Sequence, residues 1–161
     1  MNNNLNISIF GLGYVGLPLA IKLSKYFNVI GFDKNKKRIQ ELKNYFDRNN
    51  EVQFKELKNS NLKYSLNLKD LKDTNIFIVT VPTPVNKSNK PDLQPLISAC
   101  NDIGKIISKG ATVVFESTVY PGVTEEICGP KIKKSSNLIP SVDFFLGYSP
   151  ERMNPGDKIH S

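Results

Sequence analysis

Hydrophobic and polar positions follow two different periods along the chain, and the period switches repeatedly from one to the other. Short apolar runs rich in Val, Ile and Phe predict strands, whereas apolar residues spaced three and four apart predict helices. The predicted strands are Ile7–Phe10, Val29–Phe32, Leu62–Leu66, Ile76–Val81, Ala111–Phe115 and Phe144–Tyr148. The predicted helices lie near Tyr14–Tyr26, from the lysine cluster to about Tyr45, at Val52–Leu57, from Pro95 through Ile107, and at Thr124–Ile132.

Strands that alternate with helices are typical of a parallel sheet with helices on both faces. The run Ile76–Val81 is apolar almost throughout, as expected for a strand buried on both sides. The segment 82–95 holds four prolines and predicts a long loop, and Gly110 predicts a helix C-cap. The sequence therefore predicts an α/β fold with a doubly wound, mainly parallel six-stranded sheet and right-handed crossovers.

Three glycines follow the first predicted strand at Gly11, Gly13 and Gly16, in the spacing G-x-G-x-x-G. Between a strand and a helix, this spacing is typical of the turn that binds the pyrophosphate of a dinucleotide. The first glycine permits a tight turn, the second a close approach to the pyrophosphate, and the third the packing of helix on strand. Amide groups at the helix N-terminus would also face the phosphates. These features predict a Rossmann-type sheet.

Asp33 follows the second predicted strand, 17 residues beyond Gly16. A carboxylate there can accept hydrogen bonds from ribose hydroxyls and would repel a 2′-phosphate, which favours NAD over NADP. Lys34 and Arg38 leave the preference open, because nearby cations could partly offset that repulsion. The alternative role for Asp33 is that of a helix N-cap.

Composition narrows the function classes. The chain has 161 residues, of which 39% are hydrophobic and 23% charged, as in a soluble globular domain. No apolar run approaches the ~20 residues that span a bilayer, and the N-terminus lacks a signal-peptide pattern. Two cysteines, without metal-ligand spacing, predict a reducing, cytoplasmic setting, core thiols and no metal site.

The net charge of +7 is concentrated in residues 1–75, which carry 13 basic and 7 acidic side chains. Its densest cluster, residues 34–38, opens a predicted helix and has no interleaved aromatics. We interpret it as a solvated helix face and predict neither a nucleic-acid nor a membrane partner. An anionic nucleotide would still benefit from the same field.

Hydroxyl and carboxyl residues follow the later strands, in the segments VPTP at 81–84, ESTVYPG at 116–122 and SPER at 149–152. Ligands of open parallel sheets bind at the carboxyl ends of the strands. The segments IFGLGYVGLPLA, GFD, VPTP, ESTVYPGVTEE and GYSPERMNPGDK, in this order, resemble the UDP-glucose/GDP-mannose dehydrogenase family. The form SPERMNPGDK looks most like the branch that acts on UDP-N-acetylhexosamines in bacterial polysaccharide synthesis.

The resemblance implies oxidation of the sugar C6 alcohol to a carboxylate by two NAD+ in turn, through a cysteine-bound intermediate. It also implies that Thr118 and Glu151 lie at the catalytic water and that Thr83 and Thr118 lie near the cofactor. The predicted cofactor contacts are Gly11, Gly13, Tyr14, Val15, Gly16, Asp33, Arg38, Val81, Pro82, Thr83 and Thr118.

UDP-glucose-specific members commonly carry an acidic residue where this chain has Pro155, which favours the N-acetylhexosamine branch. Neither Cys100 nor Cys128 matches the family nucleophile, and His160 receives no role. We therefore expect residues 1–161 to be the N-terminal domain of a longer, homodimeric enzyme, without its dimerisation helix and UDP-sugar domain. We expect this domain alone to be inactive.

Three alternatives stay open: a UDP-glucose 6-dehydrogenase, another NAD-dependent dehydrogenase of the hydroxyacid type, and a stand-alone, non-catalytic NAD-binding module. VPTP together with SPER counts against the hydroxyacid type.

Overall fold

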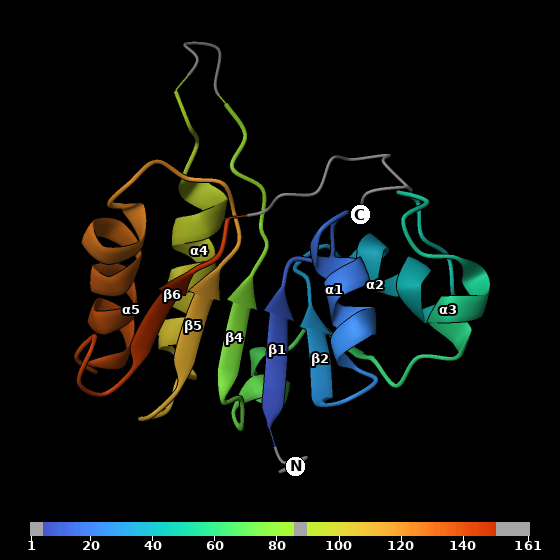
Figure 1. Ribbon diagram of the computed structural model, residues 1–161, viewed down its shortest axis with the longest axis horizontal. Helices are drawn as coiled ribbons and strands as arrows, with labels where there is room; N and C mark the ends of the chain where they lie inside the picture. Colours follow the sequence, from blue (N-terminus) through green and yellow to red (C-terminus); the bar gives the residue numbers. More distant parts are fainter. Residues whose placement is uncertain (1–4, 86–89, 151–161) are drawn as a thin grey trace.

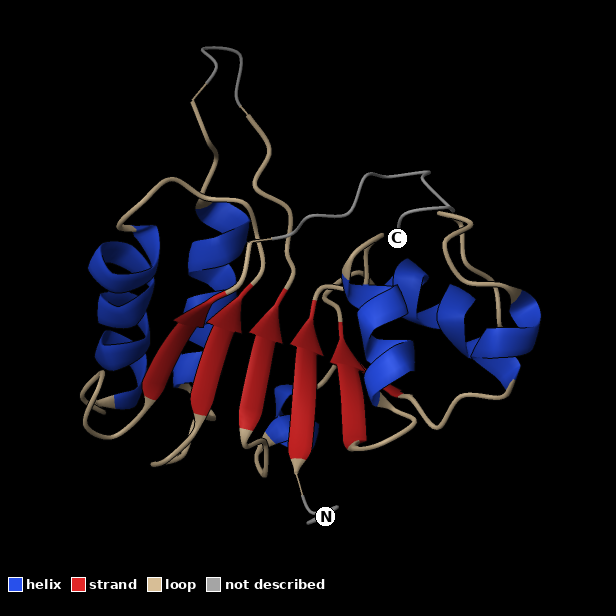
Figure 2. Ribbon diagram, viewed as in Figure 1, coloured by secondary structure: helices blue, strands red, loops and turns tan. Residues whose placement is uncertain are grey.

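The computed structural model describes residues 5–85 and 90–150. Its strands are β1 (Asn6–Phe10), β2 (Asn28–Phe32), β3 (Lys63–Ser65), β4 (Ile76–Val79), β5 (Thr112–Phe115) and β6 (Phe145–Tyr148). They form one sheet in the order β3-β2-β1-β4-β5-β6, and every neighbouring pair is parallel. The strand arrows therefore all point to the same edge in Figure 2. The predicted doubly wound fold is confirmed, and the sheet is wholly parallel.

The connections between the strands carry the helices. In chain order these are α1 (Gly16–Leu23), α2 (Lys36–Lys43), α3 (Phe54–Lys58), the 3-10 helix η1 (Leu68–Leu71), α4 (Gln94–Gly104), the π-helix η2 (Val123–Cys128) and α5 (Gly129–Ser136). The chain leaves β1 towards β2 on one side and returns as β4 on the other (Figure 1). This reversal of strand order is the place where doubly wound sheets bind ligands.

Two apolar clusters sandwich the sheet, because successive strand residues point to opposite faces. Ile9 of β1 and Ile78 of β4 belong to the cluster that contains α1, α2 and α3. Phe10 and Phe77, their chain neighbours, belong to the cluster that contains α4 and α5. The rings of Phe10 and Phe32 lie 4.8 Å apart, centroid to centroid, directly beneath the glycine turn. The core therefore holds the ends of β1 and β2 in fixed register at the predicted site.

Helix boundaries differ from the predictions in three places. Helix α1 begins at Gly16, since Tyr14 and Val15 form the turn before it. Gly110 is not a helix C-cap: α4 ends at Gly104, and Gly110 (φ +84°) turns the chain into β5. The helix predicted at Thr124–Ile132 is longer and is divided in two: η2 ends at Cys128, and α5 continues from Gly129 to Ser136. Pro130 lies in the first turn of α5, where its missing N–H costs least.

Candidate cofactor-binding site

The glycine turn joins β1 to α1 at the carboxyl edge of the sheet. Gly11 has φ +97° and donates its N–H to the carbonyl of Phe32 at 2.9 Å. A Cβ on Gly16 would collide with the Gly11 carbonyl oxygen and with Thr80 Oγ1. The third glycine therefore lets the turn close against its own first residue and against the chain leaving β4. The close packing that this glycine was predicted to permit therefore lies between the start of α1 and the chain just beyond β1 and β4.

Gly13 differs from the other two glycines. A Cβ built on it would meet no protein atom within 4 Å. Packing therefore does not require glycine at this position, whereas close approach of a ligand to the backbone would. Helix α1, which begins three residues later, has neither a capping side chain nor an acidic residue in its first turn. The amide groups of that turn can therefore face an anion.

Thr80 holds the turn from the neighbouring strand. Its hydroxyl donates to the Gly11 carbonyl oxygen at 2.7 Å and lies 3.1 Å from that of Phe10. The sequence analysis included Thr80 in the strand, but β4 ends one residue earlier, at Val79. A single hydroxyl at the end of an apolar run was the only sequence signal for this role.

Asp33 braces the same turn from β2. Its Oδ2 accepts the Leu12 N–H at 2.9 Å, and its Oδ1 accepts the Asn35 N–H at 2.8 Å. The N-cap of α2 is Asn35, whose side chain accepts the Arg38 N–H. The N-cap alternative for Asp33 is therefore wrong. Each carboxylate oxygen retains a second lone pair that a ribose hydroxyl could use.

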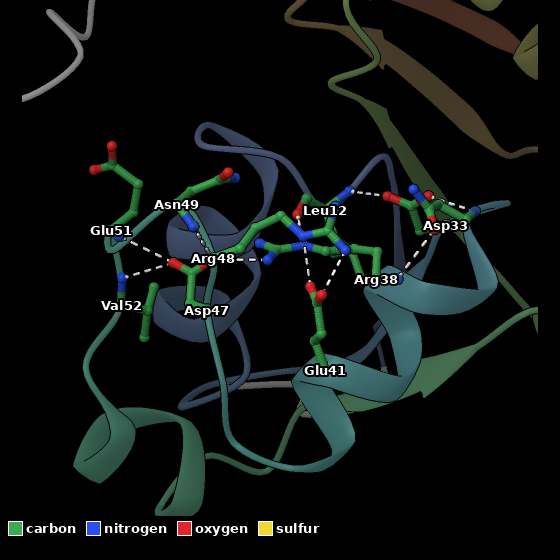
Figure 3. A network of polar contacts seen from close by, with 10 residues as sticks. Leu12, Asp33, Arg38, Glu41, Asp47, Arg48, Asn49, Glu51 and Val52 are labelled. Carbon is green, nitrogen blue, oxygen red and sulfur yellow. Dashed lines mark hydrogen bonds and ion pairs between the residues drawn. The ribbon is translucent and has the colours of Figure 1, made fainter.

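Arg38 is buried beneath the turn instead of lining it (Figure 3). Its Nε donates to the Leu12 carbonyl oxygen at 2.7 Å. Asp33 accepts the Leu12 N–H, so the two side chains together bind both backbone polar groups of Leu12. The Arg38 Nη1 lies 2.8 Å from Asp47 Oδ1 as an ion pair, without the alignment of a hydrogen bond. Direct contact of Arg38 with a cofactor stays a prediction.

Asp47 was not singled out by the sequence analysis. Its carboxylate accepts backbone N–H groups from three residues of its own loop, Asn49, Glu51 and Val52. Figure 3 shows these bonds beside the Arg48–Glu41 ion pair. Asp47 thereby anchors the loop after α2 and neutralises Arg38.

Two adjoining hollows lie along the glycine turn. The larger has a volume of about 440 Å³ and is lined by nine of the eleven predicted cofactor contacts, all except Gly16 and Arg38. The nine are Gly11, Gly13, Tyr14, Val15, Asp33, Val81, Pro82, Thr83 and Thr118. The smaller, of about 220 Å³, shares Gly11, Asp33, Val81 and Pro82 with it and is walled by Phe10, Phe32, Lys34, Pro95, Ser98 and Ala99. The structure thus brings the predicted residues together in one elongated cleft.

A hollow of about 650 Å³ lies at the opposite edge of the sheet, near Asn6, Lys25 and Asp73. It is larger than either part of the cleft, but it contains none of the predicted site residues. Its position at the amino ends of the strands is also the wrong edge for a ligand of this fold.

The loops after β4 and β5 are tied together beside the larger hollow. Thr83 Oγ1 donates to the Thr118 carbonyl oxygen at 2.7 Å, and Ser117 Oγ donates to the Val81 carbonyl oxygen at 2.6 Å. The Thr118 side chain itself stays exposed. Glu151, the second predicted catalytic residue, lies outside the described residues, as do Pro155 and His160.

Cys100 and Cys128 are both buried in the core. The hydrogen bond that the Cys100 thiol donates to Cys128, together with burial, raises the pKa of Cys100. A thiol in that state is a poor nucleophile. The prediction that both cysteines are core residues is confirmed.

Within residues 5–85 and 90–150, no cluster of His, Cys, Asp or Glu side chains could hold a metal ion. No helix in the same ranges is long and apolar enough to cross a membrane.

A wholly parallel sheet whose switch point carries this glycine turn, braced by a carboxylate from β2, defines a dinucleotide-binding domain of the Rossmann type. Residues 5–161 match the family model described as the UDP-glucose/GDP-mannose dehydrogenase family, NAD binding domain. The chain belongs to that family, and its cofactor is NAD.

Two curated proteins are similar to this chain over nearly its whole length. It is 55% identical to Protein CapL of Staphylococcus aureus and 53% identical to UDP-N-acetyl-D-glucosamine 6-dehydrogenase of Pseudomonas aeruginosa. Each match covers 98% of this chain but 37% of the relative, so the chain spans little more than a third of their length. A ternary complex of GDP-mannose dehydrogenase from Pseudomonas aeruginosa superposes with a TM-score of 0.85 at 30% identity, over 92% of this chain and 36% of that one.

Proposed function

We propose that residues 1–161 form the cofactor domain of an enzyme that oxidises C6 of a UDP-N-acetylhexosamine to the uronic acid. The main support for the cofactor site is the open space at Gly13. Gly13 lines the larger hollow together with Val15, just before α1, and with Asp33. The name of the 53% identical relative, UDP-N-acetyl-D-glucosamine 6-dehydrogenase, supports the substrate class.

The cleft has a place for each part of the cofactor. The pyrophosphate would lie on the turn from Gly11 to Gly16, and the adenosine ribose would lie at Asp33. The apolar walls of the smaller hollow, including Phe32 and Pro95, suit an adenine ring. The larger hollow, with Thr83 and Thr118 at its far wall, would receive the nicotinamide.

The bound nicotinamide supplies a hydride acceptor for the sugar C6 carbon. This chain's own contribution is to fix the position of that acceptor: Thr83 and Ser117 cross-link the two loops that flank the nicotinamide position. We propose that Thr118 and Glu151 lie at the catalytic water.

We propose that the nucleophile and the sugar-binding residues lie outside residues 1–161, since both cysteines of this chain are buried. As the family resemblance implies, the complete enzyme would be a cytoplasmic homodimer.

Titration of the chain with NAD+ and NADP+, followed by NMR chemical shifts, tests the cofactor site. We expect NAD+ to bind and Asp33→Asn to weaken NAD+ by roughly tenfold, since an acceptor for the ribose hydroxyls becomes a neutral amide. Asp143→Asn, at the other edge of the sheet, is the control. Unchanged NAD+ affinity in Asp33→Asn would remove Asp33 from the site.

The substrate proposal requires the protein together with whatever sequence follows residue 161 in its gene. NADH formation is measured with UDP-N-acetylglucosamine, UDP-N-acetylgalactosamine and UDP-glucose. We expect an N-acetylated sugar to be preferred and to yield two NADH per molecule. A preference for UDP-glucose would contradict the proposed substrate class.

A further inference from the structure

Four cations follow Asp33 in the sequence, Lys34, Lys36, Lys37 and Arg38, and one that reached the ribose could attract the 2′-phosphate of NADP and so weaken a preference for NAD. Lys36 and Lys37 line neither hollow of the cleft. Arg38 is already engaged by groups of the protein. Its side chain is 6% exposed, pairs with Asp47 and donates to the Leu12 carbonyl oxygen. Lys34 remains, with a side chain that is 55% exposed and lines the smaller hollow together with Asp33.

Lys34 is held by helix α4. Its Nζ lies 2.5 Å from Asp102 Oδ2 and donates to Ser98 Oγ at 2.6 Å. Ser98 and Asp102 are four residues apart and therefore face the same way, one helical turn from each other. The ammonium of Lys34 thus reaches across from the end of β2 to α4.

Asp102 is well placed to hold a cation. Its carboxylate is 9% exposed and also pairs with Lys105, at 3.1 Å. An anion that is mostly withdrawn from water is screened less than one on the surface, so its attraction for Lys34 is stronger. Lys105 is the C-cap residue of α4, whereas Lys34 comes from the loop after β2, at the cofactor-binding edge.

We propose that Asp102 is a specificity-determining residue: by holding Lys34 on α4, it keeps a cation away from the 2′ position of the adenosine ribose and so favours NAD over NADP. This inference rests on the proposed cofactor site. NADP differs from NAD by a 2′-phosphate, a dianion that a lysine beside the ribose would attract. Asp33 would repel that phosphate directly, and Asp102 would hold back the cation that lines the same hollow.

The test is the ratio of the NADP+ and NAD+ dissociation constants, measured by NMR titration on the chain with Asp102→Asn. Asparagine keeps the side-chain size but loses the charge, which releases Lys34. We expect the ratio to fall about fivefold, at the upper end of what a partly exposed charge pair supports. A purely structural role for Asp102 would weaken both cofactors together and leave the ratio unchanged.

Two further variants identify Lys34 as the mediator. Lys34→Ala alone should leave the ratio within about twofold of wild type, since Asp102 already holds that side chain. In the double variant, Lys34→Ala should abolish the gain produced by Asp102→Asn. Asp143→Asn is the matched control, because it breaks another lysine–aspartate pair, with Lys109 at 2.9 Å, at the opposite edge of the sheet.

If NAD+ binds but the ratio is unchanged in Asp102→Asn, or the gain survives in the double variant, the inference is overturned and the cofactor site stands. If the wild-type chain binds neither cofactor, the proposed cofactor site fails and the inference fails with it.

Discussion

Substitution of Asp47 by alanine should destabilise the domain more than substitution of any surface carboxylate. The Asp47 side chain is 1% exposed, and its loss leaves the Arg38 guanidinium, 6% exposed, without its counter-ion. Removing one partner of a buried ion pair costs about 3–5 kcal/mol, because the other charge stays buried and unpaired. Three backbone N–H groups also lose their acceptor, although those near the surface can bind water.

A loss of about 4 kcal/mol is a large share of the ~5–15 kcal/mol typical of a domain. With a urea dependence of about 2 kcal/mol per molar, the unfolding midpoint of Asp47→Ala should fall by about 2 M. Urea unfolding followed by far-UV circular dichroism measures this shift. Glu41→Gln is the control, because it breaks the exposed ion pair with Arg48 and should lower the midpoint by less than about 0.5 M.

A midpoint for Asp47→Ala within about 0.5 M of wild type would refute this reasoning. It would mean that water reaches Arg38 or that Asp47 does not neutralise it. A large fall for Glu41→Gln as well would show that the assay responds to any lost charge.

Three further predictions concern other parts of the molecule. Both thiols, Cys100 and Cys128, should react with Ellman's reagent only after unfolding, because the core buries them; rapid reaction of the native chain would contradict the packing. The bidentate hydrogen bond from Arg48 lowers the pKa of Glu41 below its ordinary 4.5. The stability that this pair contributes is therefore present above pH 4.5 and is lost as the pH falls through the lowered pKa. The urea midpoints of wild type and Glu41→Gln should accordingly converge between about pH 6 and about pH 3. Gly16→Ala should lower the thermal midpoint, since its Cβ would collide with the carbonyl oxygen that begins the glycine turn; a wild-type melting curve would show that the turn can open.

The sequence predicted the strands well because a parallel strand buried on both faces is an unbroken apolar run, as at Ile76–Val79. It also predicted that the glycines and Asp33 lie together at one edge of the sheet, because they follow consecutive strands. Helix ends were harder. The helix predicted to end at Ile132 runs on to Ser136 in α5, which has Pro130 in its first turn, where proline is tolerated.

The residues that brace the site could not be predicted from local patterns. Asp47 forms an ion pair with Arg38, and the Thr80 hydroxyl donates to the Gly11 carbonyl oxygen. Both contacts form only when the chain has folded. Asp102 is more than sixty residues away from Lys34 in the sequence and belongs to no motif. Charge pairs of this kind depend on which elements the fold brings together. The spacing of residues in the sequence does not predict which elements those are.

The central claim is that the turn from Gly11 to Gly16 binds the pyrophosphate of NAD+. The most direct test is an NAD+ titration of the wild-type chain beside Gly13→Ala, with a thermal melt of each. Since a Cβ on Gly13 meets no protein atom within 4 Å, Gly13→Ala should melt like wild type. Its methyl group would occupy the space of the pyrophosphate, so it should lose NAD+ binding by at least about tenfold. Undiminished NAD+ binding by a folded Gly13→Ala chain would contradict the claim.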